Sequence, residues 1–215
     1  ELLKAFAVSE VAPASAANPT PASAAGVATT RPDPDFIDLF SPSEHDAWKQ
    51  CGKGGLTFKN DGTATSWFPA GSRYFGVAWY SKRTFKDFIW KVEFRGMQAE
   101  YNSGLRLRFP KPDQDVSFIS DNGYEISIYD PQMNDANLVT GAIGRLQAPS
   151  SSKLNPPGEW NSLEVSAVGQ KYVVTLNGKV VNRFTGDRLT EGYIGLESHM
   201  RGSVEFRNAF IKPLP

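Results

Sequence analysis

The stretch Lys171-Tyr-Val-Val-Thr-Leu-Asn-Gly-Lys-Val-Val-Asn-Arg-Phe184 is the most informative about the fold of this chain. In it, Asn177-Gly178 separates two runs that are rich in β-branched and aromatic residues. Asn and Gly both accept the positive φ angles of a type I′ turn, whose twist matches that of paired strands. The stretch therefore predicts a β-hairpin. A further turn at Val168-Gly169-Gln170, just upstream, extends it to a three-stranded antiparallel meander.

Short β-rich runs separated by turn residues continue through most of the chain. From Phe36 onwards, Gly and Pro separate short runs of Val, Ile, Phe, Trp and Tyr, and no long segment has a helical period. We expect strands over residues 36–40, 56–59, 63–67, 75–80, 88–95, 104–109, 124–129, 161–168, 171–176, 179–184, 192–197 and 203–212. So many strands exceed one open sheet. The expected architecture is all-β: two antiparallel sheets packed face to face as a jelly-roll sandwich.

Composition limits the kind of protein. The chain has 215 residues, of which 40% are hydrophobic and 21% are charged, which suffices for one sizeable core. Lys plus Arg and Asp plus Glu number 23 each, so no net field favours nucleic acid as a partner. No apolar run approaches the roughly 20 residues that span a bilayer. Cys51 is the only cysteine, which excludes an internal disulfide and leaves a buried structural thiol as its expected role.

The first 35 residues differ in composition from the rest. We expect residues 1–35 to form an arm or linker and residues 36–215 to form the domain. Val11 to Thr30 is rich in Ala, Pro, Ser and Thr and has no charged residue. Such a segment is typical of linkers between modules of exported proteins, although it could also be an extended arm that packs on the domain. It favours a secreted or cell-envelope location, and a fused or neighbouring catalytic module as a partner.

Three predicted strands separate polar from apolar side chains, because neighbouring side chains on a strand point to opposite faces. Glu197 and His199 share one face, and a carboxylate beside an imidazole can form an acid/base pair. If the three strands are neighbours, their polar faces form one surface that carries Gly104, Arg106, Arg108, Glu125, Ser127, Tyr129, Glu197 and His199. On it, Gly104 would leave room for a ligand close to the backbone. For each arginine the alternative is a surface charge at the edge of the sheet.

A series of short motifs indicates a family. In chain order they are Asp38-Leu39-Phe40 with Trp48, Phe88 to Arg95, Asn102-Ser103-Gly104, Gly123-Tyr124-Glu125, Thr140-Gly141-Ala142-Ile143, Pro157-Gly158-Glu159-Trp160-Asn161, Leu176-Asn177-Gly178, Ile194-Gly195-Leu196 with His199, and Val204-Glu205-Phe206-Arg207-Asn208. With these motifs the chain resembles the 3-keto-disaccharide hydrolase family, also described as a domain of unknown function, from about Phe36 to Pro213. The resemblance implies a concanavalin-like jelly roll and a carbohydrate substrate.

The resemblance also implies a site on the concave face of the sheet. The family's Asn-Ser-Gly, Gly-Tyr-Glu and strand-closing His fall on Asn102 to Gly104, Gly123 to Glu125 and His199. The implied substrate-binding residues are Asn102, Ser103, Gly104, Arg106, Arg108, Ser127 and Tyr129. Glu197 departs from the family pattern, which often has Gln and then Asn or Asp before that His.

The implied chemistry is cleavage beside a ketone. A ketone at C3 of a sugar acidifies the proton on C2, so that a base can remove it while an acid protonates the departing glycosidic oxygen. His199 or Glu125 is the candidate base, and Glu197 and Asp130 are candidate acids. Arg106 or Tyr124 could stabilise the oxyanion, although strand alternation points Tyr124 away from Glu125.

Other functions stay open at this stage. Glu125 and Glu197 could flank a bond in ordinary glycoside hydrolysis, but the sequence does not fix their separation. No cofactor is evident, although Glu125, Glu197 and His199 could ligate a divalent metal. The non-enzymatic alternative is a carbohydrate-binding module that stacks sugar rings on exposed aromatic residues. The candidates for such stacking are Trp67, Trp79, Tyr80 and Tyr129.

Overall fold

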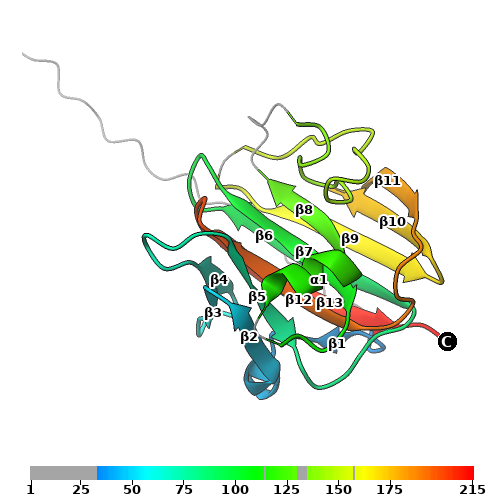
Figure 1. Ribbon diagram of the computed structural model, residues 1–215, viewed down its shortest axis with the longest axis horizontal. Coiled ribbons are helices and arrows are strands. Elements are labelled where there is room, and N and C mark those ends of the chain that lie inside the picture. Colours follow the sequence, from blue (N-terminus) through cyan, green and yellow to red (C-terminus); the bar gives the residue numbers. More distant parts are fainter. Residues whose placement is uncertain (1–32, 114, 130–134, 157) are drawn as a thin grey trace, which may run out of the picture. The chain divides into compact units, whose positions relative to one another are not determined.

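The computed structural model describes residues 33–113, 115–129, 135–156 and 158–215, which form two antiparallel β-sheets packed face to face (Figure 1). The larger sheet has eight strands: β11 (Lys179–Thr185), β10 (Lys171–Leu176), β9 (Asn161–Val168), β6 (Phe88–Gly96), β13 (Val204–Pro213), β4 (Ala64–Trp67) and β3 (Gly55–Phe58) in spatial order, with β1 (Ile37–Asp38) paired to β13. The smaller has five, in the order β2 (Trp48–Gly52), β5 (Phe75–Tyr80), β12 (Tyr193–His199), β7 (Asn102–Phe109) and β8 (Tyr124–Tyr129). The predicted all-β sandwich is confirmed.

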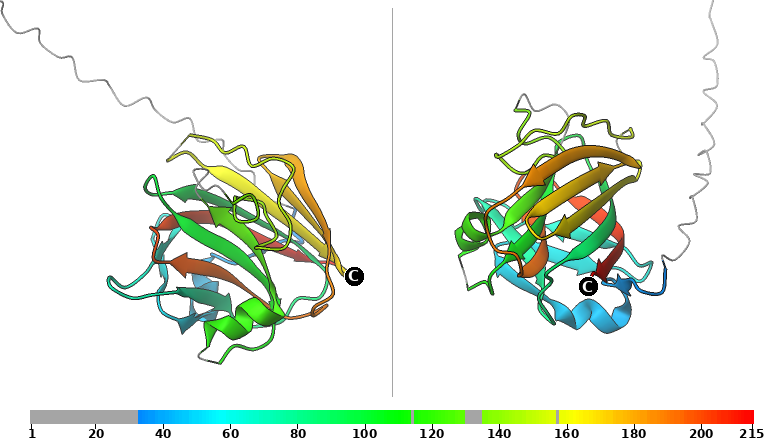
Figure 2. Two further views of the ribbon diagram at one scale, coloured as in Figure 1. Left: turned by 45° about the horizontal axis from the view of Figure 1, so that its top comes forward. Right: turned by 90° about the vertical axis from the view of Figure 1, so that its right-hand side faces the viewer.

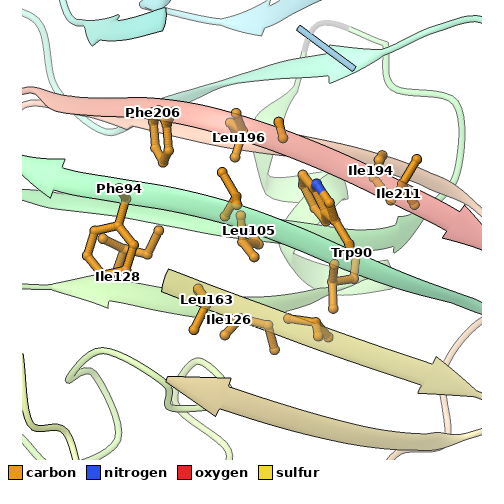
Figure 3. Close-up of a cluster of buried hydrophobic side chains, with 14 of the residues drawn as sticks. Trp90, Phe94, Leu105, Ile126, Ile128, Leu163, Ile194, Leu196, Phe206 and Ile211 are labelled. Atoms are coloured by element: carbon orange, nitrogen blue, oxygen red, sulfur yellow. The ribbon is translucent and has the colours of Figure 1, made fainter. Parts of the chain in front are cut away.

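The core lies between the two sheets (Figure 3). Trp90, Phe94, Leu163, Phe206 and Ile211 come from the larger sheet, and Leu105, Ile126, Ile128, Ile194 and Leu196 come from the smaller. Every second residue of β6 is buried, as a strand with one face on the core requires. On β7, β8 and β12 the residues that alternate with these core residues lie on the outer face of the smaller sheet, where most of them are also buried.

Two short elements differ from the expected strands. β2 was not predicted, because Lys49 and Gln50 are exposed on an edge strand that pairs only with β5. The strand expected over residues 36–40 is shorter, since the Phe40 N–H binds the Asp38 carboxylate and the chain turns there. The helices are a 3-10 turn over Pro42–Ala47 and α1 over Val116–Asn122. Cys51 on β2 is buried as expected.

The arm and linker predicted from the first 35 residues fall almost entirely outside the described residues. Asp33 and Asp35 are described, and their carboxylates lie 3.2 and 2.7 Å from the Lys212 ammonium on β13. No helix in the described ranges is long and apolar enough to cross a bilayer.

The hairpin that dominates the sequence analysis has the expected turn. Asn177 and Gly178 both have positive φ, 48° and 78°, and Leu176 pairs with Lys179 across the two-residue loop. A Cβ at Gly178 would have nothing within 4 Å, so only the backbone conformation restricts this position.

Gly178→Val should therefore destabilise the domain by about 1–2 kcal/mol, the cost of a left-handed conformation for a residue with a Cβ. The measurement is urea unfolding at neutral pH. Lys179→Val is the control, because Lys179 is exposed on a regular strand and its replacement should change the free energy of unfolding by at most about 0.5 kcal/mol. Equal stability of the two variants would contradict the prediction.

Two segments cover part of the outer face of the smaller sheet (Figures 1 and 2). Helix α1 packs against β7, β5 and β8, and the Asp115 side chain caps its first turn by accepting from the Ser117 N–H. The segment 138–146 runs beside the edge strand β8. Its backbone bonds are those of Ser127 N–H to Ala142 O, Gly141 N–H to Ser127 O and Gly144 N–H to Glu125 O, at 2.9–3.0 Å. Both segments are thereby fixed next to the polar residues of β7 and β8.

Candidate functional site

A cavity of about 620 Å³ opens on the outer face of the smaller sheet. This volume is within the range of about 300–1,000 Å³ that is usual for small-molecule sites. The lining residues come from β5, β7, β8, β12, α1, the 138–146 segment and the connections after α1, β11 and β12: Phe75, Asn102, Arg106, Ser120, Asp121, Gly123, Tyr124, Glu125, Ser127, Tyr129, Leu138, Gly144, Arg145, Leu146, Arg188, Glu197, His199 and Arg201. The assumption that β7, β8 and β12 lie near one another is correct, since β7 pairs with both of the others.

Arg106 binds two carboxylates at the floor of the cavity. Its Nε donates to Glu197 Oε2 at 2.9 Å, and its Nη2 lies 3.0 Å from Glu125 Oε2 and also donates to Glu197 Oε2. The Arg106 guanidinium is 4.7 Å above the Phe75 ring, and its Nη1 donates to Ser120 Oγ at 3.1 Å. Arg106 is only 6% exposed and Glu197 only 2%. One buried cation is thus shared by two carboxyl groups, so it is unfavourable for both of them to be ionised at the same time.

Glu125 has an environment suited to proton transfer. Burial raises the pKa of the Glu125 carboxyl, Arg106 opposes this rise, and the neighbouring Glu197 charge adds to it. The net direction is upward, towards the range in which a carboxylate exchanges protons at neutral pH. Of the two carboxylates on Arg106, Glu125 is also the more accessible, since Glu197 lies beneath the guanidinium with almost no exposed surface.

His199 is neutral in this environment. Burial and the nearby Arg201 charge lower its pKa to about 4, while Glu125 opposes that shift. Its Nδ1 accepts the backbone N–H of Arg201 at 3.1 Å. Because a neutral imidazole with Nδ1 as acceptor carries its proton on Nε2, the Nε2 of His199 is a hydrogen-bond donor. This geometry favours Glu125 over His199 as the base.

Two glycines make room for the Glu125 side chain. A Cβ on Gly104 would lie 2.9 Å from Glu125 Cγ, and one on Gly144 would lie 2.9 Å from Glu125 Oε2. The space that Gly104 was expected to leave for a ligand is therefore occupied by a catalytic candidate. Gly144, which the sequence analysis missed, has the same effect from the opposite side.

Most of the sequence-predicted site residues line the cavity: Asn102, Arg106, Glu125, Ser127, Tyr129, Glu197 and His199. Ser127 Oγ donates to Glu125 Oε1 at 3.3 Å. Ser103 does not line the cavity, because alternation turns it inward, where its Oγ donates to the Glu197 carbonyl oxygen at 2.6 Å. Asp130 lies outside the described residues.

The prediction for Arg108 is wrong. β7 contains a β-bulge against β12, since Tyr193 pairs with Phe109 whereas Gly195 pairs with Arg106. Arg108 has a positive φ of 49° at this bulge, and the extra residue breaks the alternation. Its fully buried guanidinium donates to Asp87 Oδ1 at 3.1 Å and to the Tyr172 hydroxyl at 3.0 Å. Arg108 therefore ties the two sheets together and takes no part in the cavity.

Tyr124 and the proposed stacking residues are also placed differently from a sugar-binding platform. The Tyr124 ring packs in the core, and its hydroxyl accepts the backbone N–H groups of Asp187 and Arg188 at 2.8 and 2.9 Å. Trp79 and Tyr80 are buried, and the exposed Trp67 belongs to β4 in the other sheet. Of the four aromatic candidates, only Tyr129 lines the cavity.

The residues that reach the cavity from outside the three strands were not predicted from the sequence. Arg145, Arg188, Arg201 and Asp121 lie in loops or on α1, where no alternation marks their direction. The only signal was the motif Thr140 to Ile143, which precedes Gly144 and Arg145. Among the described residues, no group of three or more His, Cys, Asp or Glu is placed to hold a metal ion.

Residues 35–212 match the model of the 3-keto-alpha-glucoside-1,2-lyase-like domain. The chain belongs to this family. The match confirms the resemblance read from the sequence motifs, and the 3-keto-glucoside lyase-like domain includes every described residue of the cavity.

Solved structures confirm the fold of this lyase-like domain. A protein from Parabacteroides distasonis, described as a "putative glycosyl hydrolase", is 21% identical with a TM-score of 0.64, covering 83% of this chain and 99% of that chain. A Bacillus subtilis protein with a galectin-like fold is 14% identical with a TM-score of 0.61, covering 82% and 94%. A carbohydrate-binding module from Bacillus subtilis is 14% identical with a TM-score of 0.56, covering 77% and 95%. A search of curated proteins finds no match.

Proposed function

We propose that this domain cleaves the glycosidic bond of 3-keto-glycosides by elimination, with Glu125 as the base. The observation that carries the proposal is the Arg106 cluster, in which a buried guanidinium holds Glu125 beside the deeply buried Glu197. Membership in the 3-keto-alpha-glucoside-1,2-lyase-like family supports the same substrate class. The cavity volume of about 620 Å³ accommodates a small sugar.

In the proposed reaction, the Glu125 carboxylate removes the proton from C2, which the ketone at C3 has acidified. The electron pair of the C2–H bond forms a double bond between C1 and C2 as the bond from C1 to the glycosidic oxygen breaks. The departing oxygen takes a proton, which Glu125 can return after the abstraction. Addition of water to the double bond would complete hydrolysis; without this addition the reaction is that of a lyase.

The other groups have supporting roles in this scheme. The neutral His199 offers its Nε2–H to the ketone oxygen, where negative charge develops as the C2 proton leaves. Glu197 has little contact with solvent, so we assign it the role of holding Arg106 and raising the pKa of Glu125 rather than that of the acid. Asn102, Ser127 and Tyr129 would bind sugar hydroxyls from the cavity wall.

The test is aglycone release from a 3-keto-glucoside, with the corresponding unoxidised glucoside as the control. Release from the keto sugar alone supports elimination, because only the ketone acidifies the C2 proton. Equal release from both sugars would indicate ordinary hydrolysis with two carboxylates. Binding of the keto sugar without turnover would show a carbohydrate-binding module instead.

The proposed role of His199 requires a neutral ring with its proton on Nε2. The chain has two histidines, so long-range ¹H–¹⁵N spectra resolve both imidazoles. We expect His199 to be the Nε2–H tautomer, with its titration midpoint near pH 4 instead of the ordinary 6.5. A midpoint at 6.5 or above, or a proton on Nδ1, would contradict the assignment.

The lowered pKa also has a consequence for stability. Between pH 4 and 6.5 the unfolded chain binds more protons at His199 than the folded chain, so protonation of this residue favours unfolding. The stability that the neutral His199 contributes is fully present above pH 6.5 and is lost as the pH falls through 4. His199→Gln should accordingly lose less stability than the wild-type protein over this range, as measured by urea unfolding. An identical pH dependence in the two proteins would rule out this contribution.

We also propose that the protein is exported. The support is the uncharged Ala-, Pro-, Ser- and Thr-rich composition of Val11 to Thr30. A fused or neighbouring module that oxidises sugars at C3 would supply the proposed substrate.

A further inference from the structure

Arg145 and Arg188 line the cavity and have no role in the scheme above. Arg145 lies in the 138–146 segment, and Arg188 lies between β11 and β12. Neither guanidinium forms an ion pair with a carboxylate among the described residues, where the ion pairs inside the cavity are those of Arg106. The Arg145 charge acts on Glu125 only at longer range, where it lowers the pKa of that carboxyl. Among the described residues of the lining, Arg106 already takes up two of the three carboxylates, Glu125 and Glu197, and the third is Asp121.

Arg145 is fixed next to Glu125 by its backbone. The Gly144 N–H binds the Glu125 carbonyl oxygen at 2.9 Å, and the Arg145 N–H binds the Asn137 carbonyl oxygen at 3.0 Å. Arg145 itself has a φ of 61°, a left-handed conformation that non-glycine residues adopt infrequently. A side chain held on a strained backbone at the wall of a cavity is typical of a functional position.

Arg188 is held in place by neutral groups. Its Nη1 donates to the Ser120 carbonyl oxygen at 2.8 Å and also to the Gly123 carbonyl oxygen, and its guanidinium lies 5.1 Å from the centre of the Tyr124 ring. These acceptors set the direction of the half-buried side chain but carry no formal charge. A guanidinium fixed in this way is well prepared to bind an anion, because little side-chain entropy is lost when the anion arrives.

We propose that Arg145 and Arg188 form a carboxylate-binding subsite, and that the preferred substrate is a 3-keto-glycoside whose leaving group carries a carboxylate. The inference rests on the proposed function and adds the class of the leaving group. Its geometric basis is the order of the strands, since β8 with Glu125 is the edge strand and β7 and β12 lie to one side of it.

The order of the strands sets the orientation in which the substrate would bind. Arg106 and His199, on β7 and β12, lie on the inner side of Glu125 in the sheet. Arg145 and Arg188 are attached at the Glu125 end of β8, through Gly144 to Glu125 and through Arg188 to Gly123. The keto sugar would therefore lie over Glu125 and His199, and the leaving group would extend towards the two arginines. Arginine binds carboxylates through two parallel N–H···O bonds, which would fix this orientation.

The experiment compares two substrates that differ only in charge: the 3-keto-glucosides of gluconate and of gluconamide, each prepared as both anomers. The expected kcat/KM at low salt is about 10- to 100-fold higher for the gluconate compound, the effect of one or two charge-assisted hydrogen bonds. The preference should shrink in high salt, because the subsite is open to solvent ions.

Variants locate the preference. Arg145→Met should bring the ratio of the two kcat/KM values close to one, and because Arg145 is exposed the variant should fold. Arg183→Met is the matched control, since Arg183 is exposed on β11 away from this cavity and its loss should leave the ratio unchanged. Equal kcat/KM for the two substrates in the wild-type protein, or an unchanged ratio in Arg145→Met, would overturn the subsite while leaving the lyase function intact.

A binding measurement separates failure of the subsite from failure of the proposed function. If neither substrate is cleaved, the proposed function is wrong, and calorimetry with gluconate and gluconamide then tests the subsite alone. Saturable binding of gluconate that Arg145→Met abolishes would support the subsite. No difference between gluconate and gluconamide would overturn it.

Discussion

Glu125→Gln should lower aglycone release from a 3-keto-glucoside by about 10²- to 10⁴-fold, the usual contribution of a general base. The amide keeps the shape of the side chain in the space left by Gly104 and Gly144, but it cannot remove the C2 proton. The measurement is kcat under saturating substrate, with KM determined separately to show that the keto sugar still binds.

A control is needed because the substitution also removes a charge. Glu159→Gln is the control: it removes a negative charge from an exposed loop, and kcat should not change. Thermal unfolding of Glu125→Gln should show a folded protein, because burial already disfavours the charged form of this carboxyl and raises its pKa. Wild-type kcat in Glu125→Gln would exclude this residue as the base, and His199 would be the next candidate.

Arg106→Met should have the largest effect on stability of any single substitution in the cavity. It leaves Glu125 and Glu197 without their cation, and removing one partner from a buried ion pair costs about 3–5 kcal/mol. In a domain of this size, that is a fall in the melting temperature on the order of 10 °C. Urea unfolding at pH 7 gives the free energy, and aglycone release should be lost as well.

Two further variants show whether the loss comes from the unpaired carboxylates. Arg106→Met combined with Glu197→Gln should recover part of the stability, because a buried amide costs less than a buried unpaired charge. Arg95→Met is the comparison for a partly exposed arginine, and its cost should be near 1 kcal/mol or less, since its partner Glu205 keeps Lys59 at 2.5 Å. Equal losses from Arg95→Met and Arg106→Met would contradict the role of the buried cluster.

The site was predictable where strand alternation is regular. Period-two alternation, with the assumption that their three strands are neighbours, placed six residues on one surface, and all six line one cavity: Arg106, Glu125, Ser127, Tyr129, Glu197 and His199. The prediction for Arg108 was wrong because the extra residue at the bulge turns this side chain to the other face of the sheet. Nothing in the local sequence marks the bulge.

The chemical roles were harder to foresee than the positions. Glu197 and His199 were expected to be an acid/base couple, but Glu197 binds Arg106 on the neighbouring strand and His199 accepts the Arg201 N–H. Whether a carboxylate or an imidazole holds a proton depends on burial and on charges from other strands. These neighbours are remote in the sequence, since 91 positions separate Arg106 from Glu197.

The sequence by itself determined the all-β sandwich, the Asn177-Gly178 hairpin and the family. Turn chemistry and period-two alternation act between residues a few positions apart, so each can be read without the fold. The tertiary structure alone decided that β12 lies between β5 and β7, that Arg108 leaves the polar face, and that Arg145 and Arg188 enter the cavity. These outcomes depend on long-range strand pairing and on loops that lack a repeating pattern, and the energy of each contact is set by groups that only the fold brings together.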